Sequence, residues 1–169
     1  RYVVDPAESI ARYADDLKPA IPRVWADGVA RIRADLVEWL RRMISDEDYE
    51  VGWTPAHFEL SFGLRELRGQ QDPQSAIEPI DLDCGIKLRG SIDLVERRAR
   101  DGWLRATDFK SGKVRADETT VIGGGKTLQP VMYALAIEKR FPDATIWGGR
   151  LYYCTSAGDY RSFPIPPGP

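Results

Sequence analysis

The stretch RATDFKSGK, from Arg105 to Lys113, places an aspartate and a lysine two residues apart, just before a Ser-Gly turn. Side chains alternate between the two faces of a strand, so we expect Asp108 and Lys110 on one face and Phe109 on the other. The preceding IKLRGSIDLVERRA and the intervening RDG predict an antiparallel hairpin that ends in this stretch. The hairpin therefore carries a charged pair on one face of its second strand.

The first strand of this hairpin contributes a second aspartate, Asp93. Asp93 lies between Ile92 and Leu94 in GSIDLVE, so we expect it on the opposite face from these two apolar residues. The hairpin can bring Asp93 near Asp108, and two such carboxylates repel each other unless a shared proton or a cation lies between them. Mg²⁺ or Mn²⁺, bound by carboxylates, a backbone carbonyl and water, would remove the repulsion. With Lys110 beside the ion, such a site is suited to phosphodiester hydrolysis.

The same pattern has a simpler interpretation. An ordinary salt bridge between Asp108 and Lys110, beside an unrelated Asp93, is much commoner for any single D-x-K. Two further residues favour a site: Gln129 and Tyr133 lie four positions apart in TLQPVMYALAIEKRF and share one face of a predicted helix. Taken alone, Tyr133 is more typical of an aromatic core residue.

Length and composition predict one domain of the α/β (α+β) class. The chain has 169 residues, of which 43% are hydrophobic, and this is enough for a single core. We expect that domain to span residues 1–169, with a helical part over 1–50 and an α/β core over 55–155. Helices are predicted from Asp5 towards Leu17 and from Pro22 to about Ser45. The second is long and amphipathic, because apolar residues that include Ile32, Trp39 and Leu40 recur along it at three- and four-residue steps and form a stripe.

The remaining segments predict further strands and one mobile loop. Alternation in AHFELSFG predicts a half-buried strand, with Phe58, Leu60 and Phe62 on one side and Glu59 on the other. TIWGGRLYYCT and YRSFPIP predict a closing strand pair. The segment 114–126, which ends in IGGGK, has no periodicity, and we expect it to be mobile.

Charge and cysteine content exclude several classes of protein. The formal net charge is −2, from 24 basic and 26 acidic residues, so the bulk charge does not indicate a nucleic-acid binder. The two cysteines, Cys84 and Cys154, form no zinc motif or disulfide framework, which favours a reducing cytoplasm. The sequence has no apolar run of about 20 residues, so we expect no membrane partner. A start at Arg1 without methionine suggests an excised piece of a longer protein.

Three motifs in order, GSIDLVE, TDFKSGK and LQPVMYALA, resemble the RecB-like nuclease domains of the PD-(D/E)XK superfamily, as found at the end of RecB and AddB helicase-nuclease subunits. The resemblance covers residues 55–155. It implies a restriction-endonuclease-like core, with a central mixed sheet flanked by helices. It also implies that Asp93, Asp108 and the Phe109 carbonyl hold the metal and that Lys110 is catalytic. The helix motif that approaches DNA matches two residues, Gln129 and Tyr133.

The sequence departs from this family in two respects. Family members of this kind carry a metal-binding histidine on an upstream helix, whereas the only histidine here, His57, lies in the predicted strand AHFELSFG. We interpret His57 as a structural or surface residue, expect the missing ligand before Arg1, and keep Glu59 as a candidate outer carboxylate. An iron-sulfur cluster, which some relatives carry, needs four thiolates, and Cys84 and Cys154 supply only two. No cluster is therefore expected within this chain.

Three hypotheses follow. The first is a Mg²⁺- or Mn²⁺-dependent deoxyribonuclease of the exonuclease type, which acts on DNA single strands or ends within a repair or recombination protein with a helicase partner. The second is an inactive DNA-binding or scaffolding domain with the same fold. The third is an unrelated ligand-binding α/β domain with a chance D-x-K. For the first two, Lys113 and Lys126, at the two ends of the predicted mobile segment, are candidate contacts to DNA phosphates.

Overall fold

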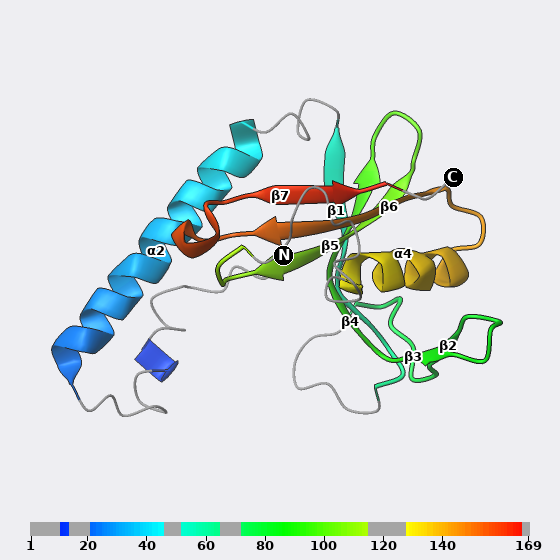
Figure 1. Cartoon of the computed structure of the whole chain (residues 1–169), viewed down its shortest axis with the longest axis horizontal. Coiled ribbons are helices and arrows are strands. Elements are labelled where there is room, and N and C mark those ends of the chain that lie inside the picture. Colours follow the sequence, from blue (N-terminus) through cyan, green and yellow to red (C-terminus); the bar gives the residue numbers. More distant parts are fainter. Residues whose placement is uncertain (1–10, 14–20, 46–51, 65–71, 115–127, 167–169) are drawn as a thin grey trace.

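A five-stranded sheet forms the body of the protein, and helices pack on it (Figure 1). The computed structural model describes residues 11–13, 21–45, 52–64, 72–114 and 128–166. The elements in chain order are α2 (Pro22–Ser45), β1 (Trp53–Phe62), β2 (Ile80–Asp81), β3 (Lys87–Leu88), β4 (Gly90–Arg98), β5 (Leu104–Lys110), α4 (Gln129–Arg140), β6 (Ile146–Tyr153), η2 (Ser156–Gly158) and β7 (Ser162–Ile165).

The central sheet is mixed, as predicted. Its strand order is β1-β4-β5-β6-β7, and a separate two-stranded sheet pairs β2 with β3. Strands β5 and β6 are parallel, and the other neighbours in the central sheet are antiparallel. A parallel pair needs a crossover connection, and α4 lies in the one between β5 and β6. This mixed sheet with its helices agrees with a restriction-endonuclease-like fold, and the predicted hairpin is β4–β5.

Helix α2 has the predicted bounds, Pro22–Ser45. Proline suits the first turn of a helix because its missing N–H has no partner there in any case. Most of the predicted apolar stripe nevertheless remains in contact with solvent: Ile32 is 61% exposed and Leu40 is 51% exposed. Most of the helix predicted from Asp5 lies outside the described residues. The described part of that stretch, residues 11–13, is helical.

Strand β1 departs from the predicted alternation. Leu60 and Phe62 are buried as expected, but Phe58, which was predicted to share their face, is 61% exposed. The pairing with β4 shifts between Pro55 and His57. In addition, Glu59 has a left-handed backbone with φ 50°, a conformation that interrupts an extended strand. The simple period of two therefore fails across the middle of this strand.

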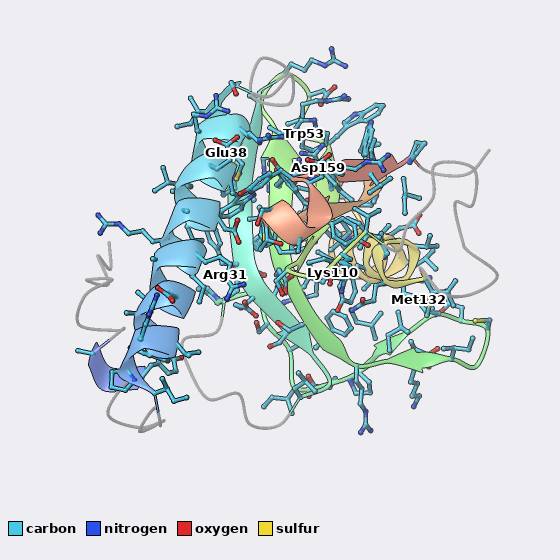
Figure 2. All side chains as sticks on the ribbon, turned by 60° about the vertical axis from the view of Figure 1, so that its left-hand side comes forward. Arg31, Glu38, Trp53, Lys110, Met132 and Asp159 are labelled. Carbon is cyan, nitrogen blue, oxygen red and sulfur yellow. The ribbon has the colours of Figure 1, made fainter. Side chains whose placement is uncertain are left out.

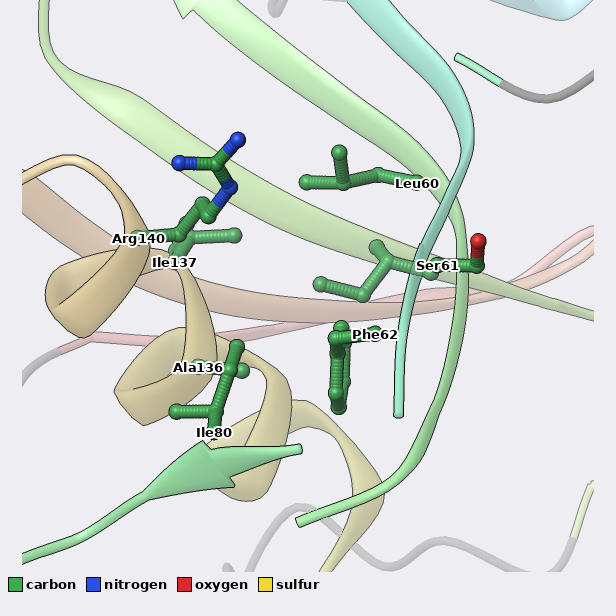
Figure 3. Close-up of a pocket in the computed structure, with 8 residues that line it drawn as sticks. Leu60, Ser61, Phe62, Ile80, Ala136, Ile137 and Arg140 are labelled. Atoms are coloured by element: carbon green, nitrogen blue, oxygen red, sulfur yellow. The ribbon is translucent and has the colours of Figure 1, made fainter. Parts of the chain in front are cut away.

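The main core lies between the sheet and α4. Strand residues such as Leu104 and Ala106 pack there with Ala136 and Ile137 of the helix. Figure 3 shows a small crevice at the edge of this core, between α4 and strands β1, β2 and β4. Its lining is formed by Leu60, Ser61, Phe62, Ile80, Ile92, Ala136, Ile137 and Arg140. Because this lining is almost wholly apolar and belongs to the core, the crevice has no catalytic group to offer.

Gly149 on β6 allows α4 to lie very close to the sheet. A Cβ atom at this position would lie 2.3 Å from the Pro130 carbonyl oxygen, in the first turn of α4. Any side chain larger than hydrogen would therefore push the helix away. The same first turn carries Gln129, so this close approach determines where Gln129 lies.

A buried charged cluster lies on the other face of β5. The Glu96 carboxylate accepts hydrogen bonds from Arg105 (Nε and Nη2, 3.0 Å each) and from the Arg150 Nη2 (3.0 Å). Thr107 Oγ1 donates to the same carboxylate and accepts a 3.1 Å bond from Arg150 Nε. The Arg105 guanidinium lies 4.3 Å from the centre of the Trp53 ring. This cluster links β4, β5 and β6 immediately before Asp108.

Candidate metal centre

Asp93 and Asp108 lie on neighbouring antiparallel strands. The register of β4 and β5 pairs Leu94 with Thr107. Asp93 directly precedes Leu94 and Asp108 directly follows Thr107, so both aspartates lie next to this pair at the same end of the hairpin ladder. The regular pairing ends there. Beyond it, the Asp93 Oδ2 accepts a 2.7 Å hydrogen bond from the backbone N–H of Phe109. The Phe109 N–H thus bonds to the Asp93 side chain instead of a backbone carbonyl of β4. This hydrogen bond holds the Asp93 carboxylate beside β5.

Asp108 is buried, with 4% of its surface exposed. It follows Leu104 and Ala106 at steps of two, so it lies on the sheet face that α4 covers. The Lys110 ammonium lies 2.5 Å from its Oδ2. Burial raises the pKa of Asp108 above its usual range, Lys110 lowers it, and the negative charge of Asp93 raises it further. The ammonium therefore compensates the buried carboxylate only in part.

Lys110 connects the strand to helix α4. Besides its contact with Asp108, the Nζ donates a 2.7 Å hydrogen bond to the Gln129 Oε1. Gln129 Nε2 in turn donates to the Tyr133 hydroxyl at 3.3 Å. Figure 2 shows Lys110 at the end of β5, between α2 and α4. The D-x-K stretch and the two helical residues predicted with it form one connected network.

The charges of both carboxylates affect the pKa of Tyr133. Burial raises the pKa of its hydroxyl most, and the hydrogen bond from Gln129 lowers it. The negative charges of Asp108 and Asp93 raise this pKa as well, while Lys110 lowers it. Both aspartates therefore lie on the α4 side of the hairpin, near the same hydroxyl.

The charge balance of this network fits a divalent cation. Two carboxylates face one ammonium, and the Asp108 Oδ2 is buried without an aligned hydrogen-bond donor among the residues that the structure describes. Within those same ranges, no three His, Cys, Asp or Glu side chains are grouped closely enough to hold a metal. An ion here would have the two aspartate carboxylates as its acidic ligands and would need neutral oxygen ligands such as water to complete its shell. Mg²⁺ accepts such a ligand set because it usually keeps several of its waters.

Glu59, the candidate outer carboxylate, and His57 have hydrogen-bond partners outside this network. The side chain of Glu59 is exposed, and its Oε2 accepts a 3.2 Å hydrogen bond from the Ser91 hydroxyl. His57 contacts the Asp72 carboxylate through Nδ1 at 3.2 Å and stacks on Phe141 with ring centres 5.1 Å apart. His57 therefore has structural partners, in agreement with its interpretation from sequence.

The predicted phosphate contacts and the cysteines complete the placement. Lys113 is exposed shortly after β5, whereas Lys126 and the predicted mobile segment beyond Val114 lie outside the described residues. Cys84 is exposed on the β2–β3 side and Cys154 is half-buried, and both are free thiols. Cys154 contacts the Lys110 carbonyl with its Sγ, 3.5 Å away.

Sequence reasoning missed two features around the network. One is the hydrogen bond from the Phe109 N–H to Asp93, which no side-chain pattern indicates. The other is Trp39 of α2, whose ring lies edge-on to Phe109 with centres 5.1 Å apart. The only local signal for Trp39 was its place in the apolar stripe of a long helix, and this did not indicate its partner.

Comparison with known proteins agrees with this geometry. The family model of the PD-(D/E)XK nuclease superfamily matches residues 4–161. The chain belongs to the PD-(D/E)XK nuclease superfamily, which assigns it a nuclease-type function with DNA as the substrate. Members of this superfamily generally use divalent metal ions. No curated protein matches the chain. Within the described ranges, no helix is both long and apolar enough to cross a membrane.

Proposed function

We propose that this protein is a Mg²⁺- or Mn²⁺-dependent deoxyribonuclease of the exonuclease type. The observation that carries this proposal is the buried Asp108 carboxylate, which contacts the Lys110 ammonium and is influenced by the charge of Asp93, and whose own charge is compensated only in part. In the proposal, Asp93, Asp108 and the Phe109 carbonyl hold the ion. When bound, the metal would polarise the phosphoryl oxygen and lower the pKa of a water molecule.

The side chains of the network have separate roles in this proposal. Lys110, which Asp108 and Gln129 hold in one position, offsets the negative charge that develops on the phosphoryl group, because a pre-positioned ammonium stabilises such charge. Gln129 holds this ammonium by its 2.7 Å hydrogen bond, and Tyr133 holds the Gln129 amide. The two helical residues thereby orient Lys110 and border the DNA backbone. Lys113, exposed nearby, and Lys126 would contact DNA phosphates.

We further propose a RecB- or AddB-like context. The order of the three motifs supports a nuclease domain over residues 1–169 that works with a helicase domain or subunit in DNA repair or recombination. Its substrates would be single strands or DNA ends. The free thiols of Cys84 and Cys154 support a cytoplasmic location.

A second candidate is an inactive DNA-binding or scaffolding domain. It is favoured by one observation: the chain's single histidine, His57, is engaged by Asp72 and Phe141, so it adds no ligand to the carboxylate pair. A centre with fewer protein ligands binds its ion less tightly.

The test is cleavage of end-labelled single- and double-stranded DNA, together with a Mn²⁺ titration of the same protein. If the proposal is correct, the wild-type protein cleaves DNA only when the metal is present. Asp108→Asn should abolish both this cleavage and tight Mn²⁺ binding. The matched control is Asp83→Asn, which removes an exposed carboxylate paired with Lys139 and should change neither result. DNA binding without cleavage at any metal concentration would support the second candidate instead. A protein that neither binds nor cleaves DNA would refute both candidates.

A further inference from the structure

Helix α2 contacts the rest of the protein through a narrow stripe. Its side chains are mostly exposed, and the half-buried ones include Asp35 and Trp39. Figure 2 shows the helix running along one side of the sheet, with Lys110 between it and α4 in this view. This stripe meets the carboxyl end of β5, where the candidate metal centre lies.

Trp39 packs against Phe109, on the face of β5 opposite to Asp108 and Lys110. Its ring lies edge-on to Phe109, with centres 5.1 Å apart, and edge-on to Tyr152 at 6.3 Å. Phe109 and Tyr152 are also in contact, with ring centres 6.2 Å apart. The Trp39 indole N–H is buried and has no hydrogen-bond partner in the described part of the chain. Ring packing, not a hydrogen bond, therefore determines what Trp39 does at this position.

Phe109 is the residue through which this packing reaches the site. It separates Asp108 from Lys110 in the chain, and its backbone N–H holds the Asp93 carboxylate at 2.7 Å. Its carbonyl is the third protein ligand of the proposed function. A rotation of the Phe109 ring and peptide would therefore disturb the two aspartates and the lysine together.

A polar contact fixes α2 where Trp39 meets Phe109. One turn before Trp39, the Asp35 Oδ1 accepts hydrogen bonds from the Ser156 backbone N–H (3.0 Å) and the Tyr160 hydroxyl (2.8 Å). About one turn after Trp39, the Arg42 guanidinium lies 4.6 Å from the centre of the Tyr160 ring. These contacts on both sides of Trp39 set the rotation of the helix against the β6–β7 turn.

We propose that Trp39 is a positioning residue for the metal centre. Trp39 acts through Phe109, and Asp35 holds Trp39 in place. This inference rests on the proposed function for its metal, but not for its structural effect. The contacts place Trp39 outside the hydrogen-bond network of Lys110, so it does not touch the reacting atoms. Its role is to keep the Phe109 peptide in the orientation that Asp93 binds.

The test compares Trp39→Ala and Trp39→Phe with Trp25→Ala, a matched control on the same helix. Two measurements are made: hydrogen exchange of the Phe109 amide in metal-free protein, and Mn²⁺ affinity by electron paramagnetic resonance. Trp39→Ala should speed Phe109 exchange and weaken Mn²⁺ binding by about tenfold, the usual effect of losing a residue that orients a ligand. Trp39→Phe should restore most of both properties, and the control should match the wild-type protein.

Two outcomes separate this inference from the proposed function. If the wild-type protein binds no Mn²⁺, the proposed function fails, but Phe109 exchange still decides whether Trp39 positions the strand. If Trp39→Ala folds and shows wild-type exchange at Phe109 and wild-type Mn²⁺ affinity, the inference is wrong. Should Trp39→Ala not fold, Asp35→Ala provides the same comparison, because it removes the contacts that hold Trp39 but keeps every aromatic side chain. Wild-type exchange at Phe109 in Asp35→Ala would then refute the inference.

Discussion

Replacement of Lys110 by alanine separates an ion pair from a catalytic lysine. In metal-free protein the change leaves the Asp108 carboxylate, 4% exposed, without its cation. A broken exposed pair costs about 0 to 1 kcal/mol and a broken buried pair about 3 to 5 kcal/mol. The Lys110 side chain is 35% exposed and that of Asp108 is 5% exposed, so the loss should lie between these two limits. We expect the free energy of unfolding to decrease by about 1 to 3 kcal/mol.

Metal should reverse this loss of stability but not the loss of catalysis. Lys110 and a divalent ion both compensate Asp108, so Mn²⁺ binding by Lys110→Ala should be as tight as in the wild-type protein or tighter. The rate of the chemical step should nevertheless fall by a factor of about 10² to 10³, because the charge on the phosphoryl group loses its stabiliser.

The assay combines urea unfolding, with and without Mn²⁺, and single-turnover cleavage at saturating Mn²⁺. Asp83→Asn, which breaks an exposed ion pair with Lys139, is the control for general effects of removing a charge contact. A Lys110→Ala protein that cleaves DNA at the wild-type rate would refute the catalytic role, and the D-x-K would then be an ordinary ion pair.

Three further predictions concern the scaffold. Glu96→Gln leaves two buried guanidiniums without their carboxylate and should lower the free energy of unfolding by about 3 to 5 kcal/mol, measured by urea unfolding; wild-type stability would exclude a structural ion cluster. Gly149→Ala drives a Cβ into the Pro130 carbonyl and should cost at least about 1 to 3 kcal/mol, whereas Gly28→Ala, at a position with open space, should not destabilise the protein. Hydrogen bonds from Ser156 and Tyr160 lower the pKa of Asp35, so its stabilising effect should be complete above about pH 4, the usual aspartate pKa, and should disappear as the pH falls through the lower folded-state pKa. The difference in melting temperature between wild type and Asp35→Ala should therefore narrow in acid, and a difference that persists there would contradict this assignment.

Much of the fold could be predicted because its signals are local. The stripe of α2 repeats at three and four residues, and its bounds, Pro22–Ser45, are confirmed. The turn RDG between two apolar runs gives the β4–β5 hairpin, and the order of the three motifs gives the superfamily. The network of Lys110, Gln129 and Tyr133 also follows from spacing, since a strand period and a helix period each specify one face.

The features that sequence reasoning missed depend on contacts between distant segments. Asp35 meets Tyr160 across 125 positions, and Arg150 meets Glu96 across 54, and neither pair has a periodic signal. Phe58 was predicted to be buried and is exposed because one left-handed residue, Glu59, interrupts its strand. A period of two predicts faces only where the backbone stays extended, and nothing in AHFELSFG indicates where it does not.

The burial of Asp108 bears most directly on whether the chain is an enzyme or a scaffold. A buried carboxylate with a raised pKa opposes folding at neutral pH, and Lys110 offsets this only in part. An apolar residue at position 108 would suit the neighbouring core of Leu104 and Ala106 better, since replacing buried charges by apolar groups is often neutral or stabilising. A scaffold would gain nothing from this destabilising charge. In the proposed nuclease, the same incompletely compensated charge would help to bind a divalent ion at the end of β5.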